Sequence, residues 1–136
     1  MNWFKSLGCI VAIVALAGCD FFNNDTSPST AVNTETFAGS LAQGGSVVFT
    51  FTVVKTGTVN VTLTALSPAS TVAVGLGVGV PTGSTGCAVT ASTSSAVAGS
   101  AAQLTTTQIA GTSCVKVFDV GTLTAATTVT VPVAHP

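Results

Sequence analysis

Apolar and polar residues alternate with a period of two through most of the chain beyond residue 34, which is the pattern of strands with one buried face. The clearest case is the segment 46–54, where Val47, Phe49, Phe51 and Val53 occupy one face. The alternation predicts about eight strands, at residues 37–41, 46–54, 59–66, 72–80, 87–91, 103–109, 113–118 and 127–133. Beyond residue 34 no stretch has the periodicity of an amphipathic helix.

Glycine, proline and serine separate these segments at intervals of about ten residues, a spacing typical of β-sandwiches and barrels. The turn at Lys55, Thr56 and Gly57 predicts that segments 46–54 and 59–66 pair as an antiparallel hairpin. About a hundred residues suffice for a modest two-sheet core. The sequence therefore predicts an all-β fold, an antiparallel β-sandwich.

Three glycines, Gly75, Gly77 and Gly79, alternate with Leu and Val in one of these segments. The run lacks the Lys-Ser/Thr of a P-loop and the spacing of a dinucleotide fingerprint, and no helical pattern follows it. We interpret these glycines as positions where another backbone approaches closely.

Charge is scarce, and its scarcity excludes several classes of function. The chain has three Lys, no Arg and four acids among 136 residues, so 5% of its residues are charged, against about a quarter in typical globular domains. A net charge of −1 without Arg cannot supply the phosphate contacts that drive nucleic-acid binding, so no nucleic-acid partner is expected. The mean hydropathy of +0.73 argues against disorder, which accompanies low hydrophobicity.

The first eighteen residues have the layout of an export signal. Lys5 precedes an apolar run at residues 7–17, which is shorter than the roughly 20 residues that span a bilayer. The run ends in the tetrapeptide Leu16, Ala17, Gly18 and Cys19. This tetrapeptide resembles the lipobox of bacterial lipoproteins, and the resemblance implies cleavage before Cys19 and attachment of acyl chains to that cysteine. The alternative is an uncleaved anchor or a short buried helix in which Cys19 is incidental.

Residues 19–33 are rich in Asn, Ser, Thr and Asp and are typical of a flexible tether, which as a coil would span about 20 Å. Asp20 resembles the inner-membrane retention signal of enterobacterial lipoproteins, but that rule varies between bacteria, so the sequence leaves the membrane open. Phe21 and Phe22 either contact the lipid interface or are scattered apolar residues.

Only two of the four cysteines are expected to form a disulfide. Cys9 lies in the export signal and Cys19 is the expected lipidation site. Cys87 and Cys114 remain, and an even pair in an exported domain predicts one disulfide. It would close a loop of about 27 residues, which the loop-entropy relation values at roughly 3–4 kcal/mol. The alternative is a pair of free buried thiols.

Residues able to carry catalysis or hold a metal are few. His135 is the single histidine, and its place next to the last residue predicts a frayed position. A Ser or Thr nucleophile needs a positioned base, and nothing in the sequence indicates that Glu35 or Asp119 converges with His135. We therefore expect no catalytic residue, no cofactor and no metal. An aromatic sugar-stacking platform is also not expected, because neither Trp nor Tyr follows Trp3.

Five segments carry a resemblance to a known module: Gly39-Ser40-Leu41, the F-x-F-x-V strand 49–53, the strand 59–66, the G-T-x-x-V-x-V strand 111–118 and the final Thr/Val strand 127–133. Across residues 37–136 they resemble the bacterial pre-peptidase C-terminal domain. The resemblance implies a jelly-roll-like sandwich that serves secreted or surface proteins as an accessory module. Collagen-binding relatives carry a calcium-binding acidic cluster and a Tyr-rich face, which this chain lacks, and Ser113 stands where the family often has an aromatic. Only the fold and the extracytoplasmic setting therefore carry over.

The sequence thus predicts an export signal at residues 1–18, a lipidated tether at 19–33 and a β-sandwich at 34–136. We expect a lipid-anchored protein of the bacterial cell envelope that acts as a non-enzymatic binding or accessory module. Its expected partner is an envelope protein or a glycan, contacted through a neutral Thr/Ser surface with adaptable loops such as residues 92–102. The alternative is a structural surface protein that associates with itself through strand edges, since the segment 46–54 carries no charge.

Overall fold

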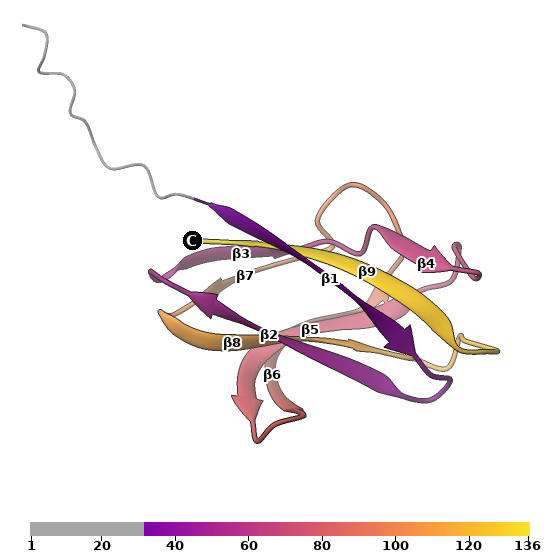
Figure 1. Ribbon diagram of the computed structural model, residues 1–136. Coiled ribbons are helices and arrows are strands. Elements are labelled where there is room, and N and C mark those ends of the chain that lie inside the picture. Colours follow the sequence, from indigo (N-terminus) through magenta and orange to yellow (C-terminus); the bar gives the residue numbers. More distant parts are fainter. Residues whose placement is uncertain (1–31) are drawn as a thin grey trace, which may run out of the picture. The chain divides into compact units, whose positions relative to one another are not determined.

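Nine strands form two facing antiparallel sheets in the computed structural model, which describes residues 32–136 (Figure 1). One sheet has the order β1 (Asn33–Leu41), β9 (Thr127–His135), β3 (Gly57–Val61) and β7 (Leu104–Gln108), with the short β4 (Ala65–Ser67) also paired to β9. The other has the order β2 (Ser46–Val53), β8 (Gly111–Phe118), β5 (Val74–Thr82) and β6 (Gly86–Ala96). The predicted all-β sandwich is confirmed.

The pairing of strands is nested along the chain. β1 pairs with β9, β2 with β8, β3 with β7, and β5 with β6. The chain is therefore a long antiparallel hairpin rolled up so that successive pairs fall in alternate sheets, which is the jelly-roll arrangement. The first and last strands of this domain lie side by side along the whole length of β1 (Figure 1).

The core consists of the inward faces that the alternation predicted. Its fully buried side chains are mostly Val and Leu and come from both sheets: Leu41, Val53, Val59, Val61, Leu63, Val74, Leu76, Val78, Val115, Val117, Val129, Val131 and Val133. Phe51 joins them with 3% of its surface exposed. Along the side of the sandwich where β1 and β2 are the edge strands, the rings of Phe37 and Phe49 stack with centroids 5.1 Å apart and close the gap between the sheets.

The predicted hairpin between segments 46–54 and 59–66 is wrong. A turn does follow β2, but β2 pairs with β8 while β3 pairs with β7 and β9 in the opposite sheet. Consecutive strands with one apolar face bury that face equally well by pairing in one sheet or by facing each other across the core. The alternation alone therefore does not distinguish the two arrangements.

The segment 59–66 is also not one strand, because it is interrupted between β3 and β4. The side-chain amide of Gln103 accepts a hydrogen bond from the Leu63 N–H at 2.7 Å and donates one to the Leu63 carbonyl at 3.1 Å. This side chain takes the place of a neighbouring strand there. It accounts for a ninth strand where the sequence predicted eight.

The loop expected at residues 92–102 is wrong in its first half, because β6 continues to Ala96. The register of β6 against β5 shifts twice, between Val74 and Leu76 and between Val78 and Gly79. Thr90 lies at the second irregularity, where its hydroxyl donates to the Val78 carbonyl at 3.2 Å. The Thr90 hydroxyl thus ties the irregular edge strand β6 to β5.

The glycine run of β5 lies where neighbouring groups approach its backbone closely, as the sequence predicted. A Cβ at Gly79 would lie 1.9 Å from the Ala88 carbonyl oxygen, and one at Gly75 would lie 2.2 Å from the Phe118 ring. All residues from Val74 to Gly79 are buried, because β6 and the Phe118 ring cover the glycine face while the sandwich core covers the other.

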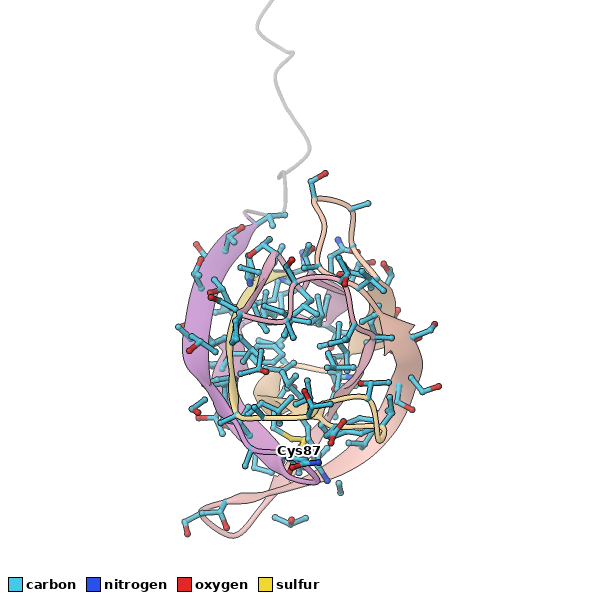
Figure 2. All side chains as sticks on the ribbon, turned by 90° about the vertical axis from the view of Figure 1, so that its right-hand side faces the viewer. Cys87 is labelled. Atoms are coloured by element: carbon cyan, nitrogen blue, oxygen red, sulfur yellow. A yellow bond between two sulfur atoms is a disulfide. The ribbon has the colours of Figure 1, made fainter. Side chains whose placement is uncertain are left out.

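Cys87 and Cys114 are at disulfide distance, as predicted, with their Cα atoms 5.9 Å apart (Figure 2). The bridge joins β6 to β8 across the intervening β5, since Cys87 pairs with Pro81 and Cys114 with Gly79. Figure 2 also shows apolar side chains filling the space between the sheets, with oxygen-tipped side chains around the outside.

Candidate functional site

Two of the four charged side chains described by the structure are acids, and they lie at opposite ends of the sandwich. Glu35 is near the start of β1, and Asp119 follows the end of β8. Antiparallel pairing places Asn33 opposite His135 and so brings Glu35 close to the histidine, while Asp119 is bound to the turn between β1 and β2. Glu35 and His135 therefore come together, and Asp119 does not join them.

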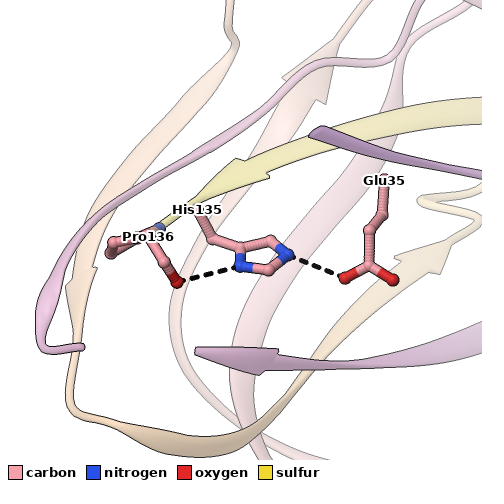
Figure 3. Close-up of polar contacts among 3 residues, drawn as sticks. All are labelled: Glu35, His135 and Pro136. Carbon is pink, nitrogen blue, oxygen red and sulfur yellow. Dashed lines mark hydrogen bonds and ion pairs between the residues drawn. The ribbon is translucent and has the colours of Figure 1, made fainter. Parts of the chain in front are cut away.

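His135 is held between two oxygen atoms (Figure 3). Its Nε2 lies 2.7 Å from Oε1 of Glu35, and its Nδ1 lies 3.2 Å from the carbonyl oxygen of Pro136. The imidazole also tilts against the ring of Phe51, with centroids 5.0 Å apart. Only 3% of His135 is exposed, so the expectation of a frayed histidine is wrong.

An open depression of about 490 Å³ lies beside this pair, between the start of β1 and the neighbouring parts of β2 and β8. Phe51 and His135 are its buried residues, and exposed polar residues surround them. The polar lining residues are Asn33, Thr34, Glu35, Thr50, Thr52 and Thr112. The first four residues of β1 are exposed on both faces, so the sheets are not closed here as they are at the Phe37–Phe49 stack.

The arrangement of the pair limits its chemistry. Both nitrogens of the imidazole face an oxygen of Glu35 or Pro136, and neither is hydrogen-bonded to a threonine hydroxyl of the depression. One carboxylate and one imidazole are also fewer ligands than a protein metal site normally supplies. Within residues 32–136 no group of three or more His, Cys, Asp or Glu side chains is placed to hold a metal ion. What the depression offers is a set of hydroxyl, amide and carboxylate groups for hydrogen bonding.

Asp119 has a structural role in a different place. Its carboxylate accepts hydrogen bonds from the Gly44 N–H at 2.7 Å and from the N–H groups of Gly121, Thr122 and Leu123 at 2.9–3.1 Å. The hydrogen bond from Gly44 is the largest cause of the lowered pKa of Asp119; burial opposes it, and the three hydrogen bonds from its own loop lower the pKa further. The carboxylate thus ties two loops together.

The expected lipidation residue Cys19 and its lipobox residues Leu16, Ala17 and Gly18 lie outside the described residues, as do Asp20, Phe21 and Phe22. Within residues 32–136 no helix is long and apolar enough to cross a membrane.

Sequence reasoning missed the Glu35–His135 contact. The two residues are 100 positions apart, and each is unremarkable in its own segment. The only signal able to reveal the pair was the register between the first and last strands. Alternation gives the period of a strand but not its partner.

No protein-family model matches the chain, and a comparison with curated proteins finds no match either.

Proposed function

We propose that this chain is a lipoprotein of the bacterial cell envelope, anchored through Cys19, whose sandwich domain is a non-enzymatic binding or accessory module. The observation that carries the proposal is the Leu16–Ala17–Gly18–Cys19 tetrapeptide after a short apolar run, followed about fourteen residues later by the first strand of a disulfide-bonded sandwich. Disulfides persist in oxidising compartments outside the cytoplasm, so the Cys87–Cys114 pair supports export independently of the signal.

The non-enzymatic part of the proposal is supported by how the scarce ionisable groups are used. His135 has both nitrogens facing oxygen atoms, and Asp119 is occupied by four backbone N–H groups. Many of the other exposed positions are threonine or serine. A nearly neutral surface gives no electrostatic steering, so binding of a partner would be insensitive to salt.

The resemblance to the pre-peptidase C-terminal domain fits the same proposal. It implies a jelly-roll-like sandwich, with which the nested strand pairing is compatible, and such modules accompany secreted or surface proteins. A domain of this kind with its own lipid anchor would act on a separate envelope protein or glycan rather than on a catalytic domain in the same chain.

Mass spectrometry of the protein extracted from membranes of a bacterial host tests the anchor. We expect a mature chain that begins at Cys19 and carries two or three acyl chains, and a C19A variant that keeps Met1 and no acyl chain. A wild-type chain that retains Met1 would overturn the lipoprotein proposal.

Affinity capture from the envelope tests the binding module: retention of a partner should be unchanged up to about 1 M salt, where charges are screened within about 3 Å.

Self-association through a strand edge is a second candidate, and the edge β2 favours it. The strands β1, β7, β2 and β6 at the ends of the two sheets differ in how they are protected. β7 has five residues, β6 has two register shifts, and β1 carries Glu35, whereas β2 pairs in continuous register over eight residues without a charge, a proline or a bulge. Edge strands without such features can pair with another chain.

A lysine placed on the β2 edge tests this candidate. We expect that T50K, which adds a charge to an exposed position of β2, abolishes a crosslinked dimer of the acylated protein. The matched control T58K adds the same charge to an exposed position of β3, which lies inside its sheet and has no free edge. A wild-type protein that sediments as a monomer at tens of micromolar would exclude edge pairing.

A further inference from the structure

The three most exposed large apolar side chains of residues 32–136 belong to one end of the sandwich. Val32 is 66% exposed, Val54 73% and Ile109 74%, whereas the other exposed valines range from 38% to 51%. Isolated exposed apolar residues are normal on a protein surface. Three of the most exposed ones at one end of a small domain need a reason.

Backbone contacts place the three residues together. Val32 precedes Asn33, which pairs with His135, and the Val54 N–H donates to the carbonyl of Pro136 at 3.0 Å. The loop after β2 is joined to the loop that contains Ile109 by a hydrogen bond from the Ala110 N–H to the Thr56 hydroxyl at 3.1 Å. Figure 1 shows the start of β1, the end of β2, the start of β8 and the C-terminus gathered at the left of the view. We call Val32, Val54 and Ile109 the apolar end.

One cation beside the apolar end can face an anionic surface. Lys55 is exposed and directly follows Val54 in the loop after β2. The nearby acid, Glu35, is engaged with His135. One cation beside a lipid surface with anionic headgroups contributes about 1 kcal/mol of attraction, which is about fivefold in partitioning.

The short length of chain between Cys19 and Val32 would hold this end of the domain near the membrane. Cys19 is thirteen residues before Val32, so even a fully extended chain reaches only about 45 Å and a flexible coil about 20 Å. If Cys19 is acylated, the end of the domain that carries Val32 is the end tied closest to the bilayer. Apolar residues beside a cation are what monotopic proteins place in the headgroup region.

We propose that the apolar end docks on the membrane, with Val54 and Ile109 inserted among lipid headgroups and Lys55 against anionic lipid. The inference rests on the proposed acylation of Cys19 and adds an orientation to it. The opposite end of the sandwich, with the loop at Asp119, then points away from the bilayer and is the end offered to a partner. The docked end also turns the Glu35–His135 depression toward the lipid.

A tryptophan scan tests the docking, because Trp3 is the only tryptophan and precedes Cys19, so the mature chain has none. The acylated variants I109W and V54W are reconstituted in vesicles of phosphatidylethanolamine and phosphatidylglycerol, with and without lipids brominated near the headgroup. The control V120W places the same probe at the opposite end, where Asp119 donates its N–H to the Gly45 carbonyl. We expect blue-shifted emission for I109W and V54W, with quenching by brominated lipid at least about twofold stronger than for V120W.

Each outcome decides between alternatives. Equal quenching of I109W and V120W in an acylated sample overturns the docking and leaves the anchor intact. A blue shift of I109W without quenching by brominated lipid means that protein, such as a second copy of the chain, covers the apolar end, and this also overturns it. A sample without acyl chains by mass spectrometry overturns the proposed function and the docking with it.

The role of the Lys55 charge is tested in the I109W background. Adding K55Q should raise the amount of anionic lipid needed for half-maximal quenching of the introduced tryptophan by about fivefold.

Discussion

Replacing Gly79 by alanine should destabilise the domain far more than the same change at two other glycines. The added methyl group would lie 1.9 Å from the Ala88 carbonyl oxygen, 2.6 Å from its carbon and 2.8 Å from Val89 Cα. All three atoms are backbone, in the strand β6 that the disulfide also holds against β5 and β8. No side-chain rotation relieves the contact, so the two strands must separate.

The expected cost follows from what each methyl group meets. Overpacking against a fixed neighbour destabilises the folded state by about 1–3 kcal/mol or more. The change from glycine to alanine also lowers the conformational entropy of the unfolded chain, which stabilises the folded state by about 0.4–1 kcal/mol. For G79A we therefore expect a net loss of about 2 kcal/mol. In G75A the methyl group meets only the ring of half-buried Phe118, which can rotate at a cost of about 0.5–1.5 kcal/mol, so the net loss should stay below about 1 kcal/mol.

Thermal unfolding of the oxidised protein, followed by circular dichroism, measures these differences. A loss of 1 kcal/mol lowers Tm by about 4–8 °C in a domain of this size, so G79A should unfold roughly 10 °C below wild type. The control G99A places its methyl group 3.8 Å from the nearest atom, the Val97 carbonyl oxygen, and should leave Tm unchanged or slightly raised. A Tm for G79A equal to that of G99A would refute the close approach of β6 to β5.

Three further results are expected from stability measurements of the same kind. The double variant C87A/C114A should lose about 3.5 kcal/mol of unfolding free energy in urea, the loop-entropy value for a separation of 27 residues, and a loss below about 1 kcal/mol would contradict the chain-entropy account. D119N should be less stable than wild type near neutral pH, and the difference in unfolding free energy should narrow as the pH falls below the ordinary carboxyl pKa of 3.8. Because the pKa of Asp119 is lowered in the folded protein, its stabilisation is complete above that value and is lost as the folded-state carboxylate takes up a proton. A difference independent of pH would argue against the backbone hydrogen bonds. H135A should cost about 2–3 kcal/mol because a buried ring is removed, whereas E35Q should cost at most about 1 kcal/mol because the carboxylate is 47% exposed, and equal costs would show that the ion pair dominates.

The strands could be predicted from the sequence, but their partners could not. Alternation located β2 almost to the residue and the start of β9, although β9 continues two residues beyond the predicted end, to His135. It failed for residues 62–64, where the side chain of Gln103 replaces a strand partner and leaves no mark on the local pattern. It also failed for the predicted β2–β3 pairing, because two strands bury their apolar faces equally well side by side in one sheet or facing each other across the core.

The candidate site was predictable only in part, for the same reason. The cysteine pair follows from residue types and from counting, so Cys87 and Cys114 could be matched without knowing the fold. The contact between Glu35 and His135 depends on the register of two strands at the two ends of the domain. Position along the chain suggested that His135 would be exposed, but β9 is an interior strand of its sheet, and His135 is enclosed there.

The nested pairing of strands has a consequence for how the chain is made. β5 and β6 are neighbours in sequence and can pair as soon as both have left the ribosome, but β1, the first strand of the domain to be synthesised, has no partner until β9 has emerged. Contacts of such long sequence separation are slow to form. The uncharged strand β2 likewise has no partner until β8 has emerged, only shortly before β9. The domain therefore completes its fold only after synthesis of residues 127–135. From the synthesis of β1 until that point, the unpaired apolar segments must be kept from aggregating.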